Sequence, residues 1–500
     1  ICAVAGALAA LILVLPQGGG ERAAATETEA GAFAITGAQV FDGVSMLGTA
    51  TVLVEDGVVT ALGPDLAVPD GIRVIDGAGK TVLPGLIDAH THSWGSAQED
   101  AMRFGVMTEL DMFTESAVLP AERAAREAGS NEDRADLFSA GILATVPGGH
   151  GTEYGFPIDT LSAPEDAADW VARRVDEGSD WIKLVYEPGN DFFPSLDLET
   201  ATAVIDAAHE AGLMALAHIS TLEGASDMVG AGIDGLVHTF SDLPVPAGLV
   251  AAMKERDVFI VPTLTVIGSV GGSEPGLALA TDPLIEPWLN AGQRDSLAAS
   301  FPPIEHYNLA LAMENTRVMA EAGIAILAGT DAPNPGTAHG ASLHQELEFL
   351  VAAGVPEATV LAAATGIPST RFDIGGRGHL VAGGRADFLL VNGDPLTDIS
   401  ATRDIALIIR GGKVLDRQRP DAPAARGAAP VMAAQLGDFE VGMTAPDGYV
   451  WAGTTDEMMG GASTVALSLA EGGAQGSAFA LKVEASLRPG FPFPWAGAWI

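Results

Sequence analysis

The chain of 500 residues carries 65 acidic side chains against 25 Lys and Arg, a formal net charge of −40, and a single Cys. This charge excludes nucleic acid as a partner, because phosphate groups are bound through Lys and Arg. One Cys excludes an intramolecular disulfide framework and any thiolate metal cluster. The hydrophobic content of 48% is enough for a buried core, and the length predicts about three domains, or one large domain with appendages.

Residues 1–15 (ICAVAGALAALILVL) are apolar without a break, and a polar spacer rich in Ala and Thr follows to residue 30. This pattern is typical of the apolar part and cleavage zone of a secretory signal. Because about 20 apolar residues are needed to span a bilayer, 15 are few for a stable anchor. We therefore expect an exported protein of the bacterial periplasm or the extracellular space, with an uncleaved membrane anchor as the alternative.

Two stretches far apart in the chain have the same β-like texture. Short apolar runs alternate with Gly turns over residues 31–84, where Asp-Gly pairs at 42–43, 56–57 and 76–77 predict hairpins or tight turns. The texture returns at 378–416, in ADFLLVNGD and ALIIRGGKVLD. We expect the two stretches to pair into one composite β-sandwich beside the middle of the chain.

Between them, residues 85–377 alternate apolar strand-like runs with amphipathic helices, of which 165–177, 199–211 and 305–322 are examples. The eight strand-like runs cover residues 86–92, 105–112, 140–148, 181–187, 213–220, 235–240, 258–265 and 325–331. Eight buried strands separated by helices predict an α/β fold with a closed (β/α)8 TIM barrel. An open doubly wound sheet is the competitor, which the absence of G-x-G-x-x-G after a strand weakens.

Residues 417–435 are rich in Pro, Ala and Arg, which is typical of a linker. A separate C-terminal segment, 436–500, follows and contains short runs of aromatic and apolar residues.

Polar side chains lie at or near the C-terminal ends of five of the apolar runs: His90, His92, Lys183, His218, His238 and Asp331. Active sites of (β/α)8 barrels form on the face where strands end. A charged group in an apolar strand is costly unless it is paired or bound to a metal. One such residue is readily explained as a satisfied core group, but six at the same end of successive strands predict a site.

The spacing of these residues favours a metal site. His90 and His92 are two residues apart, so both imidazoles leave the strand on the same side. His218 and His238 are 20 residues apart, close to one strand–helix repeat, which places them on neighbouring strands. Imidazole and the Asp331 carboxylate together suit zinc, with manganese, nickel or iron as substitutes. Without thiolates, the site is expected to be catalytic rather than a closed structural one.

Lys183 does not fit a simple ligand set, because an ammonium group cannot ligate a cation. If carbon dioxide adds to its amine, the carbamate has two oxygens and can bridge two metals. The alternative is a lysine paired with Asp or Glu, and spacing alone does not decide between them.

The run VLPGLIDAHTH, followed in order by Lys183, His218, His238 and Asp331, resembles the metal-dependent amidohydrolase superfamily. The resemblance covers about residues 33–416 and is strongest to the imidazolonepropionase-like and Xaa-Pro-dipeptidase-like branch. It implies a binuclear site of two divalent ions, zinc in the first place. His90 and His92 would hold one ion, His218 and His238 the other, with carbamylated Lys183 between them and Asp331 touching the first. It also implies a flanking β-sandwich.

The same resemblance implies hydrolysis of an amide or peptide-like C–N bond by a metal-bridging hydroxide. Asp331 would act as general base and then general acid, on a small substrate such as an N-acyl amino acid or a dipeptide. His150 would contact the substrate carbonyl, or else be a loop histidine bonded to backbone. Tyr186 would donate to a substrate carboxylate, and His339 would line the pocket. His344 would support Asp331 from the start of a helix.

Residues 436–500 more weakly resemble part of a complex I intermediate-associated protein 30 domain, through Trp451, TDEMMGGAS at 455–463 and FPWAGAW at 493–499. This resemblance implies a partial all-β, jelly-roll-like domain with a carbohydrate or protein partner.

Two other functions stay open. One is a cyclic-amide hydrolase or deaminase, and the other is a non-catalytic binding or assembly protein that uses the C-terminal domain. A homo-oligomer is also left open.

Overall fold

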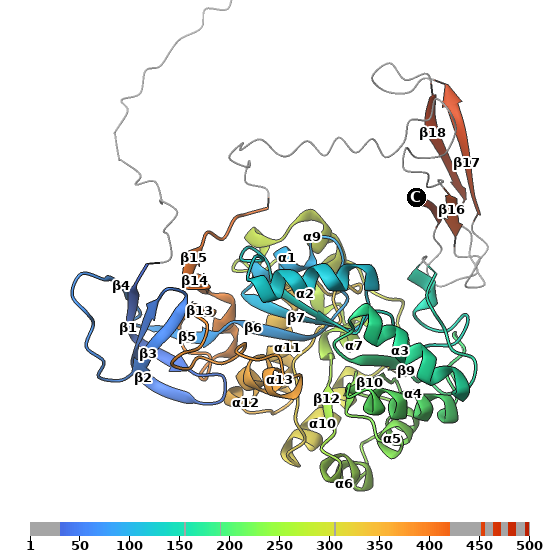
Figure 1. The fold of residues 1–500 in the computed structure, drawn as a ribbon, viewed down its shortest axis with the longest axis horizontal. Coiled ribbons are helices and arrows are strands. Elements are labelled where there is room, and N and C mark those ends of the chain that lie inside the picture. The colour runs from blue at the N-terminus through green and yellow to red at the C-terminus, as the bar shows by residue number, and fades with distance from the viewer. Residues whose placement is uncertain are drawn as a thin grey trace, which may run out of the picture.

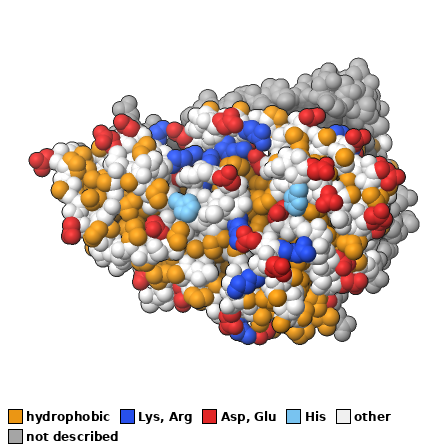
Figure 2. Space-filling model, turned by 60° about the horizontal axis from the view of Figure 1, so that its bottom comes forward, with side chains coloured by type: hydrophobic (Ala, Val, Ile, Leu, Met, Phe, Trp, Pro, Cys, Tyr) orange, Lys and Arg blue, Asp and Glu red, His pale blue; other side chains and the backbone are white. Residues whose placement is uncertain are grey.

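The computed structural model describes residues 31–154, 157–190, 192–304 and 307–420, together with four strands beyond residue 450. The signal-like segment 1–30 and most of the linker, 421–435, lie outside the described residues, so export stays a prediction. None of the described helices is both long and apolar enough to cross a membrane. On the face drawn in Figure 2, acidic side chains lie along the left, lower and right edges of the molecule.

The two β-like stretches join in one sheet, as predicted (Figure 1). Its strands run in the order β15-β14-β13-β5-β1-β2-β3, with β4 paired to β1. The junction is the antiparallel pair of β5 and β13, in which Pro84 lies opposite Phe388. A bridge between Val58 and Arg385 brings the β3 side back toward β13, so the sheet folds over its own core. The strands are β1 (Phe33–Phe41), β2 (Met46–Glu55), β3 (Val58–Gly63), β4 (Arg73–Asp76), β5 (Lys80–Pro84), β13 (Phe388–Asn392), β14 (Ile405–Arg410) and β15 (Lys413–Leu415).

The Asp-Gly signal at 56–57 marks a hairpin, as expected. Asp56 and Gly57 both have positive φ, 51° and 80°, and connect β2 to β3. A two-residue turn of this kind matches the twist of the strands it joins. The register of the hairpin is therefore encoded locally.

Two parallel sheets follow, β6-β7-β8 and β12-β11-β10-β9. Parallel bridges extend them, from Ala144 to Leu184 and from Ile260 to Ile326. The Ala89 amide donates to the Ala328 carbonyl at 2.8 Å, so the segment around residues 326–328 lies between β12 and β6. The strands are β6 (Leu86–Thr91), β7 (Val106–Asp111), β8 (Asp136–Ser139), β9 (Ile182–Val185), β10 (Ala215–His218), β11 (Gly235–Val237) and β12 (Phe259–Val261).

Two of the expected strands differ from the prediction. The third strand covers Asp136–Ser139 rather than 140–148, and of the predicted run only Ala144 pairs with β9. The chain bends at Gly141, whose φ is 66°, so the apolar run continues past the strand as a loop. The eighth run, 325–331, forms a bridge at Ile326 rather than a full strand, and the backbone turns at its end, where Asp331 has a φ of 59°.

Helices pack outside these sheets (Figure 1). The helices expected over 165–177 and 199–211 are α3 and α4, and the one expected over 305–322 is α10. Asp197 caps α4 by accepting from the Thr200 amide at 2.7 Å, which satisfies a free N–H of the first turn. The helices are α1 (Ala97–Met102), α2 (Leu119–Ala128), α3 (Ala167–Glu177), α4 (Leu198–Glu210), α5 (Leu222–Ala231), α6 (Ala247–Glu255), α7 (Leu264–Val270), α8 (Pro275–Ala280), α9 (Ala291–Ala298), α10 (Leu309–Glu321), α11 (Ala341–Ala352), α12 (Glu357–Ala363) and α13 (Gly366–Arg371).

A buried ion-pair cluster ties β8 to the composite sheet. Asp136 is fully buried and lies 2.6 Å from both Arg377 Nε and Arg410 Nη2. Burial alone would raise the pKa of Asp136, but the two guanidinium groups hold it below its usual value. The pairing therefore compensates a charge that would otherwise be costly inside the protein.

We expect Asp136→Ala to lower the free energy of unfolding by about 3 kcal/mol, because Arg377 loses its carboxylate and buried Arg410 retains only Asp387, 3.0 Å from its Nη1. Thermal or urea unfolding measures the change. The control is Glu314→Ala, which removes an ion pair of exposed Glu314 with Arg317 on α10 and should leave stability almost unchanged. Equal effects of the two changes would contradict the structural role of Asp136.

Four strands are described beyond residue 450. β16 (Ala452–Thr455) pairs with β19 (Ala496–Trp499), and β17 (Thr464–Glu471) pairs with β18 (Phe479–Ser486), both antiparallel. The jelly-roll-like domain and its partner stay predictions.

Candidate metal centre

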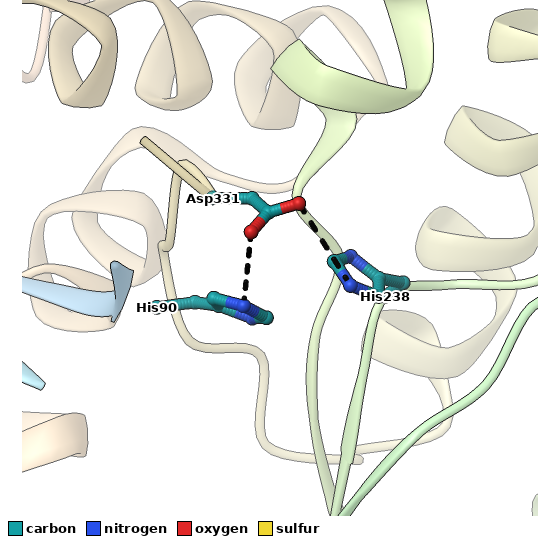
Figure 3. Close-up of side chains that lie close together, drawn as sticks. All are labelled: His90, His238 and Asp331. Atoms are coloured by element: carbon teal, nitrogen blue, oxygen red, sulfur yellow. Dashed lines mark ion pairs between the residues drawn. The ribbon is translucent and has the colours of Figure 1, made fainter. Parts of the chain in front are cut away.

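Four of the six predicted ligands meet around one carboxylate. Asp331 Oδ1 lies 2.9 Å from His92 Nε2 and 3.2 Å from His90 Nε2. The other oxygen, Oδ2, faces His238 Nε2 at 3.9 Å. Figure 3 shows the two oxygens of Asp331 pointing at the imidazoles of His90, which lies in β6, and His238, which directly follows β11. Ligand atoms of His90, His238 and Asp331 all lie within 4.8 Å of one another.

The imidazoles form a continuous row that reaches the fifth ligand. Ring centroids are separated by 5.4 Å from His92 to His90, 4.8 Å from His90 to His238 and 4.5 Å from His238 to His218. His150 continues the row, 5.0 Å from His218. The histidines predicted from separate strands therefore lie in one site.

Several polar atoms of this site are buried without a hydrogen bond: both ring nitrogens of His90, His92 Nδ1 and Asp331 Oδ1. Unpaired buried polar atoms are costly. Their short mutual approaches without hydrogen-bond geometry are the arrangement expected of ligand atoms aimed at a shared cation. The residues present thus fit a divalent metal.

The electrostatics of the site also suit metal binding, which needs neutral imidazole and ionised carboxylate. Burial lowers the pKa of His90 to about 3, and lowers that of His238 well below its usual value. Burial would raise the pKa of Asp331, but the neighbouring histidines, His90 foremost, hold it well below its usual range.

Lys183 is the sixth predicted ligand and is nearly inaccessible, with 2% exposure on β9. Burial lowers the pKa of its amine to about 7, although Asp331, Asp111 and Glu187 attract the charged form. A substantial fraction of the amine is therefore neutral near physiological pH. The neutral amine is the form that reacts with carbon dioxide.

Three residues of this region have strained backbone: His238 with φ 69°, Thr263 with φ 53° and Asp331 with φ 59°. A positive φ is uncommon for residues other than Gly, and such strain tends to persist at functional sites. His238 and Thr263 come shortly after β11 and β12, and Asp331 ends the run 325–331, so all three strained positions lie where strands or strand-like runs end.

Thr263 determines which nitrogen of His238 faces Asp331. The Thr263 hydroxyl donates to the Pro262 carbonyl at 2.8 Å and lies 2.6 Å from His238 Nδ1. Since its proton is used, the hydroxyl accepts from Nδ1–H. The Nε2 lone pair of His238 is then free to point into the site, as a metal ligand requires.

We expect Thr263→Val to weaken metal affinity and activity by about 10–100-fold, the usual effect of losing a partner that orients a ligand. Competition with a chromogenic chelator measures the affinity. Thr263→Ser keeps the hydroxyl and should behave nearly as the wild type. If Val and Ser give the same affinity, the hydrogen bond does not orient His238.

A buried set of carboxyl groups supports these ligands, and sequence reasoning did not single it out. Asp88 accepts from the Thr330 hydroxyl at 2.7 Å, and burial raises the pKa of Asp88 to about 8. Asp111 accepts from the Ser93 amide at 2.7 Å, and Glu109 accepts from the Ser93 hydroxyl at 2.9 Å. These bonds hold the turns that carry His92 and Asp331. The sequence did contain a signal for this buried set, because Glu109 and Asp111 are charged residues inside an apolar strand.

The remaining predicted residues have the following partners. His150 Nδ1 lies 3.3 Å from Glu153 Oε1, a side-chain rather than a backbone contact. His339 is buried, with Nδ1 2.7 Å from Glu109 Oε1. The Tyr186 hydroxyl donates to Asp227 on α5 at 2.9 Å, so a substrate carboxylate would compete with Asp227 for it.

The prediction that His344 supports Asp331 is wrong. His344 lies in α11, with Nδ1 3.0 Å from Thr402 Oγ1 and Nε2 3.0 Å from the Phe104 carbonyl. The helix turns this side chain away from the metal centre and toward the segments before β7 and β14. Glu187, which the sequence analysis did not single out, contacts one of the candidate ligands: its Oε1 lies 3.3 Å from His218 Nε2.

Comparison with known proteins gives a family match over most of the chain. The model of a family described as "Amidohydrolase family" matches residues 81–415. An uncharacterized protein of Mycobacterium tuberculosis is 28% identical over 267 residues, 51% of this chain and 65% of the relative's length. The chain thus spans slightly less than two thirds of that relative. An imidazolonepropionase of Phocaeicola vulgatus is 25% identical over 392 residues, 73% of this chain and 91% of that enzyme.

Solved structures share the fold. A Xaa-Pro dipeptidase superposes with a TM-score of 0.63 at 21% identity, over 77% of this chain and all of that one. A protein described as a putative prolidase from Bifidobacterium longum gives a TM-score of 0.62 at 26% identity, over 79% and 96% of the two chains.

Proposed function

Because this chain belongs to the amidohydrolase family, we propose that it is a metal-dependent hydrolase of amide or peptide-like C–N bonds. Its substrate would be a small molecule such as an N-acyl amino acid or a dipeptide. The observation that carries this proposal is the convergence of the His90, His92 and His238 imidazoles on Asp331, where both ring nitrogens of His90 and Asp331 Oδ1 are buried without a hydrogen bond.

The fold supports the same proposal. We interpret the parallel pairings from β6 through β12 and back through residues 326–328 as a (β/α)8 barrel. The folded-over sheet beside it would be the flanking β-sandwich. The candidate ligands then lie at the ends of barrel strands, where active sites of this architecture form.

His90, His92 and Asp331 would hold one divalent ion, zinc by the nature of these ligands. His218 and His238 would hold a second, with the carbamate of Lys183 between the two. Such ions supply a hydroxide nucleophile near neutral pH and polarise the substrate carbonyl.

The side chains of the chain would perform the proton transfers and the positioning. Asp331, ionised in its cluster of imidazoles, would accept a proton at a carboxylate oxygen and deliver it to the leaving amine. His150, at the end of the imidazole row, would orient the substrate carbonyl. Glu187, whose pKa falls below its usual value despite burial because of His218, would hold His218 in place.

Opening of a cyclic amide is a second candidate. It is favoured by the similarity to an imidazolonepropionase along 91% of that enzyme. The bond broken is again an amide C–N bond, so only the shape of the substrate differs.

A screen of zinc-loaded protein tests both candidates. The substrates are N-acyl amino acids, dipeptides with C-terminal Pro, Arg or Lys, and lactams. We expect hydrolysis of at least one class, abolished by a chelator and restored by zinc. A purified, active protein with no bound metal and no sensitivity to chelators would refute the metal-dependent mechanism.

A further inference from the structure

We propose that Trp94, Phe113 and Tyr154 form a subsite for an aromatic ring of the substrate, adjoining the metal centre. We call these three residues the aromatic wall. The inference rests on the proposed hydrolase function and narrows its substrate class to amides with a ring beside the scissile bond.

Each of the three rings contacts the other two. Centroids lie 6.1 Å apart for Trp94 and Phe113, 5.8 Å for Trp94 and Tyr154, and 5.4 Å for Phe113 and Tyr154. The interplanar angles of 87°, 38° and 53° are edge-on or tilted. Edge-to-face contacts of this kind are the favourable arrangement for aromatic groups, so the wall is preformed.

The aromatic wall directly adjoins a metal ligand. Trp94 stacks on His92 with a centroid distance of 5.8 Å and an interplanar angle of 14°, and Phe113 lies 6.4 Å from His92. His92 in turn lies 2.9 Å from Asp331. A substrate ring placed against the aromatic wall would therefore be separated from the reacting bond by His92 alone.

The wall is assembled from three separate loops on the face that carries the ligands. Trp94 follows β6, Phe113 follows β7, and Tyr154 ends a short 3-10 helix (Thr152–Tyr154) in the loop after β8. Loops on this face determine substrate choice in barrel enzymes.

Exposure increases across the wall. Phe113 is fully buried, Trp94 is half-buried, and Tyr154 is 41% exposed. By contrast, Trp170 and Trp181 are exposed by no more than 1% in the core. Phe113 therefore backs the wall, while Trp94 and Tyr154 carry its accessible aromatic surface. Small-molecule sites typically combine such apolar walls with a few polar groups.

The opposite end of the imidazole row is less developed. Among the described residues, Phe193 contacts the His150 ring there, edge-on at 5.4 Å. Three mutually packed rings provide more aromatic surface than this contact, so we assign the ring of the substrate to the Trp94 side.

The test compares kcat/KM of zinc-loaded enzyme for N-acetylphenylalanine, N-benzoylalanine and N-acetylalanine. The first two carry a ring on opposite sides of the same bond, and the third has none. We expect at least one ring-bearing substrate to be better than N-acetylalanine by about 10–100-fold, the range of a well-filled apolar pocket. Trp94→Ala should remove this advantage mainly through KM, and Trp94→Phe should retain most of it.

Trp288→Ala is the matched truncation, because Trp288 is half-buried and packs under Arg417 rather than at the metal centre. It should preserve the preference for ring-bearing substrates. If Trp94→Ala lowers kcat/KM equally for all three substrates, or if the wild type prefers N-acetylalanine, the subsite does not exist.

Calorimetry separates failure of the subsite from failure of the proposed function. Benzoate and phenylalanine are titrated into zinc-loaded wild type and Trp94→Ala, with acetate and alanine as ring-free ligands. Ring-selective binding that is lost in Trp94→Ala supports the subsite even if no amide is hydrolysed. Equal binding of ring-bearing and ring-free ligands overturns it.

Discussion

Asp331→Asn is expected to reduce kcat by about 10²–10⁴-fold, the contribution of a positioned acid–base group. Asp331 is the point where the site converges, within 3.2 Å of both His90 and His92 and facing His238. The amide of Asn keeps the shape and one oxygen but cannot accept and return a proton. Asn also tolerates the positive φ of this position, so the fold should persist.

Asp257→Asn is the matched control. Asp257 has almost the same backbone, φ 58° against 59°, but its side chain is 79% exposed and pairs with Arg371 far from the ligands. Steady-state kinetics of both variants measures the loss of kcat, and thermal unfolding shows whether each variant is folded. Full activity of Asp331→Asn in a folded, metal-loaded protein would rule Asp331 out as the proton carrier.

Lys183→Met is expected to abolish bicarbonate-dependent metal loading. It should also lower activity by more than about 10–100-fold, which is the usual loss when a residue that only orients a metal ligand is removed. In the wild type, metal content should rise toward two ions per chain when bicarbonate is supplied with zinc. Met fills nearly the same volume in the buried strand but has no amine to form a carbamate. Metal analysis with and without bicarbonate, and a mass increment of one carbon dioxide, provide the readouts.

Lys254→Met removes a lysine whose amine bonds the Ala322 carbonyl on the surface, and it should leave metal content unchanged. Lys183→Ala provides a second, smaller replacement in case Met perturbs packing. If activity is insensitive to both changes at Lys183, the bridging role is lost while the family membership stands.

The candidate ligands were identifiable because each is a polar residue in an apolar run. The His90–His92 spacing implies one side of a strand, and the 20 residues between His218 and His238 imply neighbouring strands. In the structure both relations are present, with a ring separation of 4.5 Å between His218 and His238. The pairing of β5 with β13 was likewise readable from two stretches of the same texture.

Other features depended on contacts between distant segments. The third strand precedes its predicted position, because an apolar run alone does not mark where a Gly bends the chain out of a sheet. The partner of Tyr186 lies on α5, 41 residues away, and that of His344 lies 240 residues away at Phe104. The residue type did not determine these partners.

The sequence by itself therefore determined the family, through the resemblance of its motifs, together with the alternation of strands and helices and the residues that can bind a metal. The alternation and the candidate ligands follow from local periodicity and from the cost of burying charge, both of which act along the chain. The tertiary structure decided which atoms meet. Thr263 orients His238 across 25 residues, Thr330 bonds Asp88 across 242, and three loops assemble the aromatic wall. Hydrogen-bond and ring contacts act over a few ångströms in space, so only the packing of remote segments establishes them.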